Sequence, residues 1–106
     1  MEKNEFLESN EFLEPSKTDF TIYSKSGCHF CTKAKTLLKE KGIKFIMIDC
    51  DEYIIENKPL FLSFIKKLAH KEYTSFPMIF YNGDFIGGYK ETEEIIKKQF
   101  LSFDEI

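Results

Sequence analysis

The spacing of hydrophobic positions changes twice in the first half of the chain. Residues 19–24 are rich in β-branched and aromatic side chains, which predicts a strand. Residues 29–41 place apolar side chains three and four positions apart, with lysines on the opposite face, which predicts an amphipathic helix that ends at Gly42. Residues 43–49 form a nearly continuous apolar run, which is typical of a strand buried on both faces beside a parallel neighbour. This half therefore predicts a β–α–β unit.

The segment that follows predicts a helix with its own cap. Residues 51–56 are weakly helical. Asn57 is suited to the N-cap position, and Pro59 then falls in the first helical turn, where its missing N–H costs no hydrogen bond. Apolar residues continue at helical spacing to about residue 70.

The remaining pattern predicts a hairpin and a final helix. Residues 76–81 form a third strand, Asn82-Gly83 is a strong signal for a two-residue hairpin turn, and residues 84–86 return as a fourth strand. Gly87-Gly88 ends that strand, and residues 90–101 have the spacing of a helix. The order β–α–β–α–β–β–α predicts an α/β fold in which helices flank a four-stranded mixed sheet.

The N-terminal segment contains a short internal repeat. Residues 4–8 and 10–14 both read Asn-Glu-Phe-Leu-Glu, which is too short and too rarely repeated for a repeat fold. Two alternatives stay open, a short helix that docks on the domain and a frayed acidic tail. The apolar residues available for docking are Phe6, Leu7, Phe12 and Leu13. We expect such a tail or short helix over residues 1–17 and one domain over residues 18–106.

The charge distribution argues against two classes of partner. The chain has 106 residues and a formal net charge of −3. Five Glu face two Lys in the first 17 residues, and the other thirteen acidic residues are balanced by thirteen Lys. A near-neutral domain gives no electrostatic reason to expect nucleic acid or an anionic membrane. The chain has no Arg, so a bound carboxylate must meet Lys or backbone N–H groups.

Cysteine usage and hydropathy suggest the compartment. The chain has three cysteines, two of them three positions apart, which argues against a secreted disulfide framework. No apolar run approaches the ~18 residues of a membrane span, and the acidic N-terminus does not resemble a secretory signal. We therefore expect a cytoplasmic protein.

Candidate redox chemistry lies at Cys28-His29-Phe30-Cys31, a C-x-x-C at the junction between the first strand and the first helix. Unpaired N–H groups and a partial positive charge at a helix N-terminus favour a thiolate. Cys28 at the helix mouth is the expected nucleophile. Cys31, one turn into the helix, can close a disulfide with it.

The alternative interpretation of these cysteines is half of a zinc site. A tetrahedral zinc usually needs a second ligand pair, which neither Cys50 nor His70 supplies, so we expect no metal.

An imidazolium at His29 would stabilise the Cys28 thiolate and lower the pKa of that thiol. Cys50 is interpreted as a small core residue rather than a regulatory thiol.

Three segments carry a resemblance to a known family. Residues 23–31, Tyr-Ser-Lys-Ser-Gly-Cys-His-Phe-Cys, resemble the active-site segment of the dithiol glutaredoxins, within the thioredoxin superfamily. Ser75-Phe76-Pro77 resembles the Thr-Val-Pro segment of that family, in which the proline is cis and faces the active site. Gly87-Gly88 follows at the spacing found in the family. The resemblance covers most of residues 19–101 and implies a thioredoxin-like fold.

The resemblance implies a glutathione-dependent enzyme that reduces glutathione mixed disulfides and protein disulfides. Glutathione would be a co-substrate, with no tightly bound cofactor, and the protein a monomer. Lys25 would face the glycine carboxylate, the Phe76 backbone would pair with the cysteinyl unit, and the start of the last helix would receive the γ-glutamyl end. The implied glutathione contacts are Lys25, Phe30, Phe76, Pro77, Gly88, Tyr89 and Lys90.

Departures from the family pattern keep other functions open. His29 replaces the usual motif proline, and relatives without that proline can share a [2Fe–2S] cluster across a dimer. Phe30 replaces the usual Tyr, and Lys90 stands where the family has Ser or Asp, which removes an N-cap acceptor. A thioredoxin-like enzyme served by a separate reductase is the other rival. The candidates for a second ligand of the glycine carboxylate are Lys66, Lys67 and Lys71.

Overall fold

A four-stranded mixed sheet forms the centre of the protein, whose structure is a computed structural model that describes residues 12–101. The strand order is β2-β1-β3-β4; β1 and β2 are parallel, and β3 is antiparallel to both β1 and β4. This confirms the predicted mixed sheet. The strands are β1 (Phe20–Ser24), β2 (Phe45–Asp49), β3 (Met78–Tyr81) and β4 (Asp84–Gly87).

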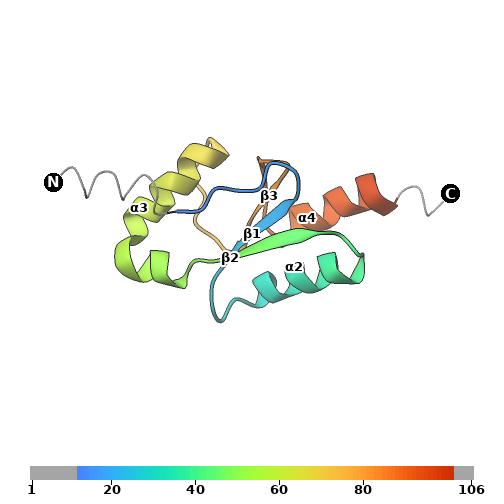
Figure 1. Cartoon of the computed structure of the whole chain (residues 1–106), viewed down its shortest axis with the longest axis horizontal. Coiled ribbons are helices and arrows are strands. Elements are labelled where there is room, and N and C mark those ends of the chain that lie inside the picture. The colour runs from blue at the N-terminus through green and yellow to red at the C-terminus, as the bar shows by residue number, and fades with distance from the viewer. Residues whose placement is uncertain (1–11, 102–106) are drawn as a thin grey trace.

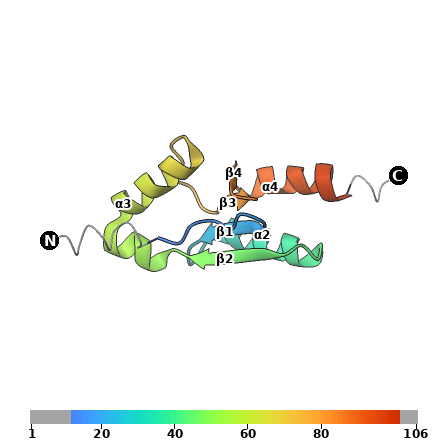
Figure 2. The same cartoon turned by 45° about the horizontal axis from the view of Figure 1, so that its top comes forward.

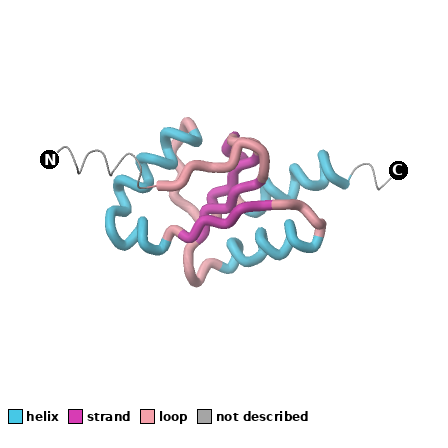
Figure 3. The backbone as a smooth tube through the Cα atoms, viewed as in Figure 1, coloured by secondary structure: helices cyan, strands magenta, loops and turns pink. Residues whose placement is uncertain are grey.

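Helices cover both faces of this sheet, as Figures 1 and 3 show. Buried residues of α3 pack with Tyr23 and Phe80 on one face, and buried residues of α2 and α4 pack with Ile22 and Ile79 on the other. The helices are α2 (His29–Glu40), α3 (Asp51–Ala69) and α4 (Tyr89–Ile96), followed by a π-helical turn, η1 (Lys97–Leu101). No helix among residues 12–101 is long and apolar enough to cross a membrane.

The apolar strand β2 lies at an edge of the sheet (Figure 2), and the exposure of its side chains corrects the expectation that it is buried on both faces. It pairs with β1 in parallel, as expected, but has no strand neighbour on its other side within the described sheet. Ile48 is buried, whereas Ile46 and Met47 are 45% and 40% exposed. The continuous apolar run predicts a strand at these residues. It does not determine where that strand lies in the sheet, because the strand order depends on how the other strands pair.

Helix α3 contains the predicted cap in its interior. Asn57 leaves helical geometry, with φ −161° and ψ 78°, and this kink divides the helix in two. The Asn57 side-chain oxygen accepts a hydrogen bond from the Leu60 N–H at 3.1 Å, as an N-cap residue does, and Pro59 lies in the turn that follows. The sequence prediction of a weak helix, a cap and a stronger helix is confirmed.

The hairpin between β3 and β4 turns at Asn82 and Gly83, as predicted. Both residues have positive φ, 55° and 88°, which is the geometry that a two-residue type I′ turn requires. The turn places β4 at the edge of the sheet opposite β2.

Phe12 ties the N-terminal segment to the α3 face. Its side chain is only 8% exposed, and its ring centroid lies 4.9 Å from Tyr53, 5.5 Å from Phe61 and 5.1 Å from Phe64. The carbonyl of Leu13 accepts a hydrogen bond from the Tyr23 hydroxyl at 2.7 Å, while the Leu13 side chain is exposed. The expected docking residues Phe6 and Leu7 lie outside the described residues, and the boundary after residue 17 stays a prediction.

Candidate active site

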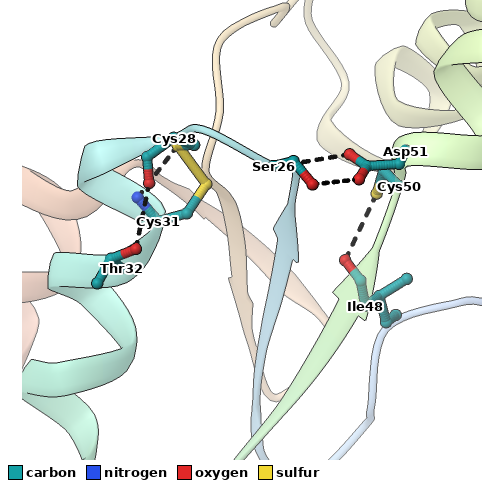
Figure 4. The surroundings of a disulfide bond; sticks show 7 residues. All are labelled: Ser26, Cys28, Cys31, Thr32, Ile48, Cys50 and Asp51. Atoms are coloured by element: carbon teal, nitrogen blue, oxygen red, sulfur yellow. Dashed lines mark hydrogen bonds between the residues drawn. A yellow bond between two sulfur atoms is a disulfide. The ribbon is translucent and has the colours of Figure 1, made fainter.

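The Cys28–Cys31 pair forms a disulfide at the N-terminus of α2 (Figure 4). Cys28 is the N-cap residue, with extended φ and ψ of −101° and 106°, and it joins the loop after β1 to the helix. The Cys31 N–H donates to the Cys28 sulfur at 3.1 Å, and the two Cα atoms are 5.2 Å apart. Cys28 is half-buried, whereas Cys31 is 2% exposed. The accessible sulfur is therefore Cys28, and the covered one is Cys31.

This arrangement suits thiol–disulfide exchange. A helix N-terminus stabilises a thiolate through its free N–H groups, and one such group already points at the Cys28 sulfur. A thiolate at Cys28 can attack an external disulfide, and Cys31 is within bonding reach to displace the product. Neither cysteine needs a metal for this step.

The loop before Cys28 is held by the start of α3, a contact that the sequence analysis missed. The Ser26 N–H donates to Asp51 Oδ1 at 2.9 Å, and the Ser26 hydroxyl donates to Asp51 Oδ2. These hydrogen bonds, with help from the Lys25 charge, hold the pKa of the Asp51 carboxyl below its ordinary value. The available signal was positional: parallel strands end at the same sheet edge, so residues just beyond β1 and β2 become neighbours.

A cleft of about 400 Å³ adjoins the cysteine pair. Its wall contains six of the seven residues expected to contact glutathione, brought together from α2, the loop before β3 and the start of α4. The seventh, Lys25, is exposed, and its Nζ lies 5.6 Å from the centre of the Phe76 ring, which lines the cleft. The lining residues are Phe30, Tyr73, Phe76, Pro77, Gly88, Tyr89, Lys90, Glu91 and Glu93.

The floor of the cleft combines a cis proline and a helix N-terminus. The Phe76–Pro77 peptide bond is cis, as the resemblance implied. Gly88 is the N-cap of α4, and its N–H donates to Glu91 Oε1 at 2.9 Å. Glu91 also lies so close to Gly87 that a Cβ there would come within 2.8 Å of Oε1. Glu91 thus takes part in the cap, and a Glu three residues after the cap position is the signal that could have identified it.

Two aromatic side chains of the cleft wall, Phe30 and Tyr89, lie close together and contact a lysine of α2 that is not itself in the wall. Phe30 is 50% exposed, and its ring lies 5.9 Å from that of Tyr89. Lys33 Nζ lies 5.5 Å from the Phe30 ring and 5.0 Å from the Tyr89 ring, which is cation–π geometry. His29 is exposed beside Phe30, with 5.5 Å between the rings, and its effect on the Cys28 pKa stays a prediction.

Tyr73 is a further cleft residue that the sequence analysis missed. A Cβ on Gly88 would lie 3.0 Å from the Tyr73 hydroxyl, so that hydroxyl reaches the start of α4. Burial raises the pKa of Tyr73, and the neighbouring Glu91 charge raises it further. No sequence signal marked Tyr73, because the loop before β3 has no regular period.

The other candidate ligands are not among the described residues that line the cleft. Cys50 is buried, and burial together with the Asp49 charge raises the pKa of its thiol to about 12, which fits a core residue. Lys66 pairs with Glu72 at 3.5 Å, and Lys71 Nζ lies 6.0 Å from the Phe85 ring. Residues 12–101 contain no group of three or more His, Cys, Asp or Glu side chains that could hold a metal ion.

Comparison with known proteins places this geometry in a family. The family model described as Glutaredoxin matches residues 20–86. Glutaredoxin-2, mitochondrial, from Bos taurus is 31% identical over 77 residues, which are 73% of this chain and 46% of that protein. Glutaredoxin 1 from Rickettsia felis is 36% identical over 67 residues, which are 63% of this chain and 61% of that protein. The chain therefore spans about half to two thirds of the length of these curated relatives.

Solved structures agree on the fold. Glutaredoxin 1 from Francisella tularensis, solved with cacodylate, has a TM-score of 0.65 at 26% identity and covers 74% of this chain and 92% of that one. A buckwheat glutaredoxin–glutathione complex also has a TM-score of 0.65, at 16% identity, and covers 92% of this chain and 84% of that one. The expected thioredoxin-like fold is confirmed. The family match and the disulfide at the C-x-x-C support thiol–disulfide oxidoreductase chemistry, and the chain belongs to the glutaredoxin family.

Proposed function

We propose that the chain is a glutathione-dependent thiol–disulfide oxidoreductase that reduces glutathione mixed disulfides and protein disulfides. One observation carries the proposal: the cleft beside the redox pair gathers six of the seven residues expected to contact glutathione. Phe30 lies between the two cysteines in sequence and lines the cleft, so a ligand there lies next to the nucleophile.

The reaction follows from the two unequal cysteines. The Cys28 thiolate attacks the glutathione sulfur of a mixed disulfide; a Cys28–glutathione disulfide forms, and the substrate leaves as a thiolate that takes up a proton. A second glutathione thiolate then attacks this adduct, which releases oxidised glutathione and restores the Cys28 thiolate. Alternatively, Cys31 attacks Cys28, which releases reduced glutathione and leaves the Cys28–Cys31 disulfide for two glutathione molecules to reduce.

Charge and backbone groups around the cleft suit glutathione as a co-substrate. The N-terminus of α4 offers N–H groups and a partial positive charge to the α-carboxylate of the γ-glutamyl end. Lys90 adds a positive charge on the same side, and Lys25 lies by Phe76 where the glycine carboxylate is expected. The buckwheat relative was solved as a glutathione complex, which supports the same class of ligand here.

Turnover with two reducing systems tests the proposal. One assay supplies glutathione, glutathione reductase and NADPH with a glutathione mixed disulfide; the other supplies thioredoxin reductase and NADPH with a protein disulfide. We expect turnover in the first assay. Turnover in the second assay alone would overturn the proposal and identify a thioredoxin-like enzyme.

Oligomeric state, compartment and resident cofactor are part of the same proposal: a cytoplasmic monomer without a tightly bound group. Similar proteins include mitochondrial and chloroplastic glutaredoxins, so localisation of the protein in its source cell tests the proposed compartment. Size-exclusion chromatography and the absorbance spectrum of anaerobically purified protein test the other two points. A brown dimer with charge-transfer absorbance would favour the [2Fe–2S] alternative.

A further inference from the structure

The three residues before Cys28 have little packing of their own. Lys25, Ser26 and Gly27 are all exposed. A Cβ placed on Gly27 would meet no atom within 4 Å, so this turn touches little of the surrounding protein. Hydrogen bonds rather than apolar contacts must therefore hold the loop that connects β1 to the nucleophile.

Those hydrogen bonds come from the junction between β2 and α3. The Cys50 N–H donates to the Ser24 carbonyl at 2.8 Å and so extends the β1–β2 pairing by one residue. Asp51, the first residue of α3, then receives both the N–H and the hydroxyl of Ser26, as Figure 4 shows. Its two carboxylate oxygens each bind a different donor from the same residue, which fixes the direction as well as the distance of the loop.

Asp51 is itself held in place. Its N–H donates to Asp49 Oδ1 at 3.0 Å, and Asp49 is the last residue of β2, paired with Ser24 of β1. The tether therefore connects the loop to two packed elements, β2 and α3. A charged acceptor bound by two donors contributes more than a neutral hydrogen bond.

We infer that Asp51 is a positioning residue, which holds the loop over residues 25–27 so that Lys25 stays beside the glutathione cleft. The inference rests on the proposed function and adds a residue outside the cleft to it. Loss of the tether lets Lys25 sample many positions, which weakens glutathione binding. Cys28 stays anchored as the N-cap of α2, so the chemical step after binding changes little.

Two substitutions at Asp51 separate the tether from the charge. Asp51→Ala removes both acceptors. We expect the KM for glutathione to rise about five-fold with kcat within about two-fold, because the two lost hydrogen bonds affect binding only indirectly, through the position of Lys25. Asp51→Asn keeps an oxygen for the Ser26 N–H and offers an amide N–H to the Ser26 hydroxyl, so we expect KM within about two-fold of the wild type. Glu52→Ala is the matched control, because it removes an exposed carboxylate one position along the same helix turn.

A measurement without glutathione keeps the tether separate from the proposed function. Amide hydrogen exchange at Ser26 and Gly27 in the oxidised protein should be faster in Asp51→Ala than in Glu52→Ala or Asp51→Asn. If Asp51→Ala does not fold, Ser26→Ala removes the hydroxyl donor alone, and a rise in KM of about two-fold is then expected.

The outcomes are distinct. Unchanged exchange in Asp51→Ala would show that no tether exists, and faster exchange with an unchanged KM would show that the tether does not position the ligand. An equal loss in Asp51→Asn and Asp51→Ala would assign the effect to charge. If the wild type has no glutathione turnover, the proposed function fails and the positioning role toward glutathione fails with it, while faster exchange would still confirm the tether.

Discussion

Cys28 and Cys31 lie one helical turn apart in environments that differ in access to solvent. The Cys28 sulfur accepts an N–H from the helix it caps and is half-buried, whereas Cys31 faces the core on the buried side of α2. A thiolate needs both stabilisation and access in order to attack an external disulfide. Only Cys28 combines the two, and this difference leads to separate expectations for the two thiols.

Replacement of each cysteine by serine tests these roles. Cys28→Ser should abolish reduction of a glutathione mixed disulfide, because the nucleophile is removed. Cys31→Ser should retain that activity, because a second glutathione can take the place of the resolving thiol. The glutathione-coupled assay measures both, and an inactive Cys31→Ser variant would contradict the monothiol route.

His29 provides a second test at this scale. A histidine at the position of the usual motif proline adds a backbone N–H and, when protonated, a positive charge next to Cys28, and both favour the thiolate. His29→Pro should therefore raise the Cys28 pKa. Thiolate absorbance followed against pH in a Cys31→Ser background measures the shift, and a midpoint that does not move upward would remove His29 from this role.

Cys50 should behave as a thiol of the core. Burial raises its pKa to about 12, whereas an unfolded thiol ionises near ~8.5. The protonated thiol therefore stabilises the fold fully below about pH 8.5, and this contribution is lost as the pH rises toward 12. At pH 8 a disulfide reagent should react rapidly with Cys28 of the reduced native protein, and Cys31 should then displace the bound reagent by closing the Cys28–Cys31 disulfide. Cys50 should react only after unfolding. Rapid reaction of Cys50 in the native protein would show that its thiol is accessible.

At the scale of elements, the sequence was most informative where structure depends on neighbours along the chain. The Asn57 cap, the Asn82-Gly83 turn and the C-x-x-C at the start of α2 all depend on residues within a few positions, and all were predicted. The edge position of β2 was not, because strand order is set by pairing between distant segments. The Ser26–Asp51 contact spans 25 residues and was missed for the same reason.

The Asn57 cap at the kink in α3 can be tested by substitution. Asn57→Ala removes the side-chain oxygen that caps the second part of the helix, and we expect a loss of about 1 kcal/mol in the free energy of unfolding. Chemical denaturation followed by circular dichroism measures the loss. Lys58→Ala is the matched control, because Lys58 is exposed and adjacent; a similar loss in that variant would show that the loss does not come from the missing cap.

At the scale of the molecule, the site lies where separate segments converge. The start of α2, the loop before β3 and the start of α4 all contribute to the cysteine pair or the cleft, although they span residues 28 to 93. The two faces of the sheet contribute differently to the site and to the core. The α2 and α4 face carries the helix termini of the site, and the α3 face buries the aromatic cluster that includes Phe12.

The Phe12 contact has a consequence for stability, because the chain carries two copies of the sequence that makes it. Aromatic side chains of α3 contact the Phe12 ring, and the Tyr23 hydroxyl of β1 donates to the backbone carbonyl of the next residue, Leu13. Residues 4–8 offer the same five amino acids as residues 10–14. Exchange of one copy for the other lengthens the connection to β1 by six residues, and the entropic cost of a longer loop grows only with the logarithm of its length.

The two copies should therefore make the contact redundant. Phe12→Ala alone should cost roughly 0.5 kcal/mol of unfolding free energy, the scale of a longer loop, and about 3 kcal/mol when Phe6→Ala is also present, the usual cost of losing a buried Phe. Phe6→Ala alone should change little. Chemical denaturation of the wild type, the two single variants and the double variant measures the energetic coupling between Phe6 and Phe12. Additive losses of stability would show that the two copies are not interchangeable. Because a second copy of the segment can make the same contact, substitutions at Phe12 should lower the free energy of unfolding less than the burial of Phe12 suggests.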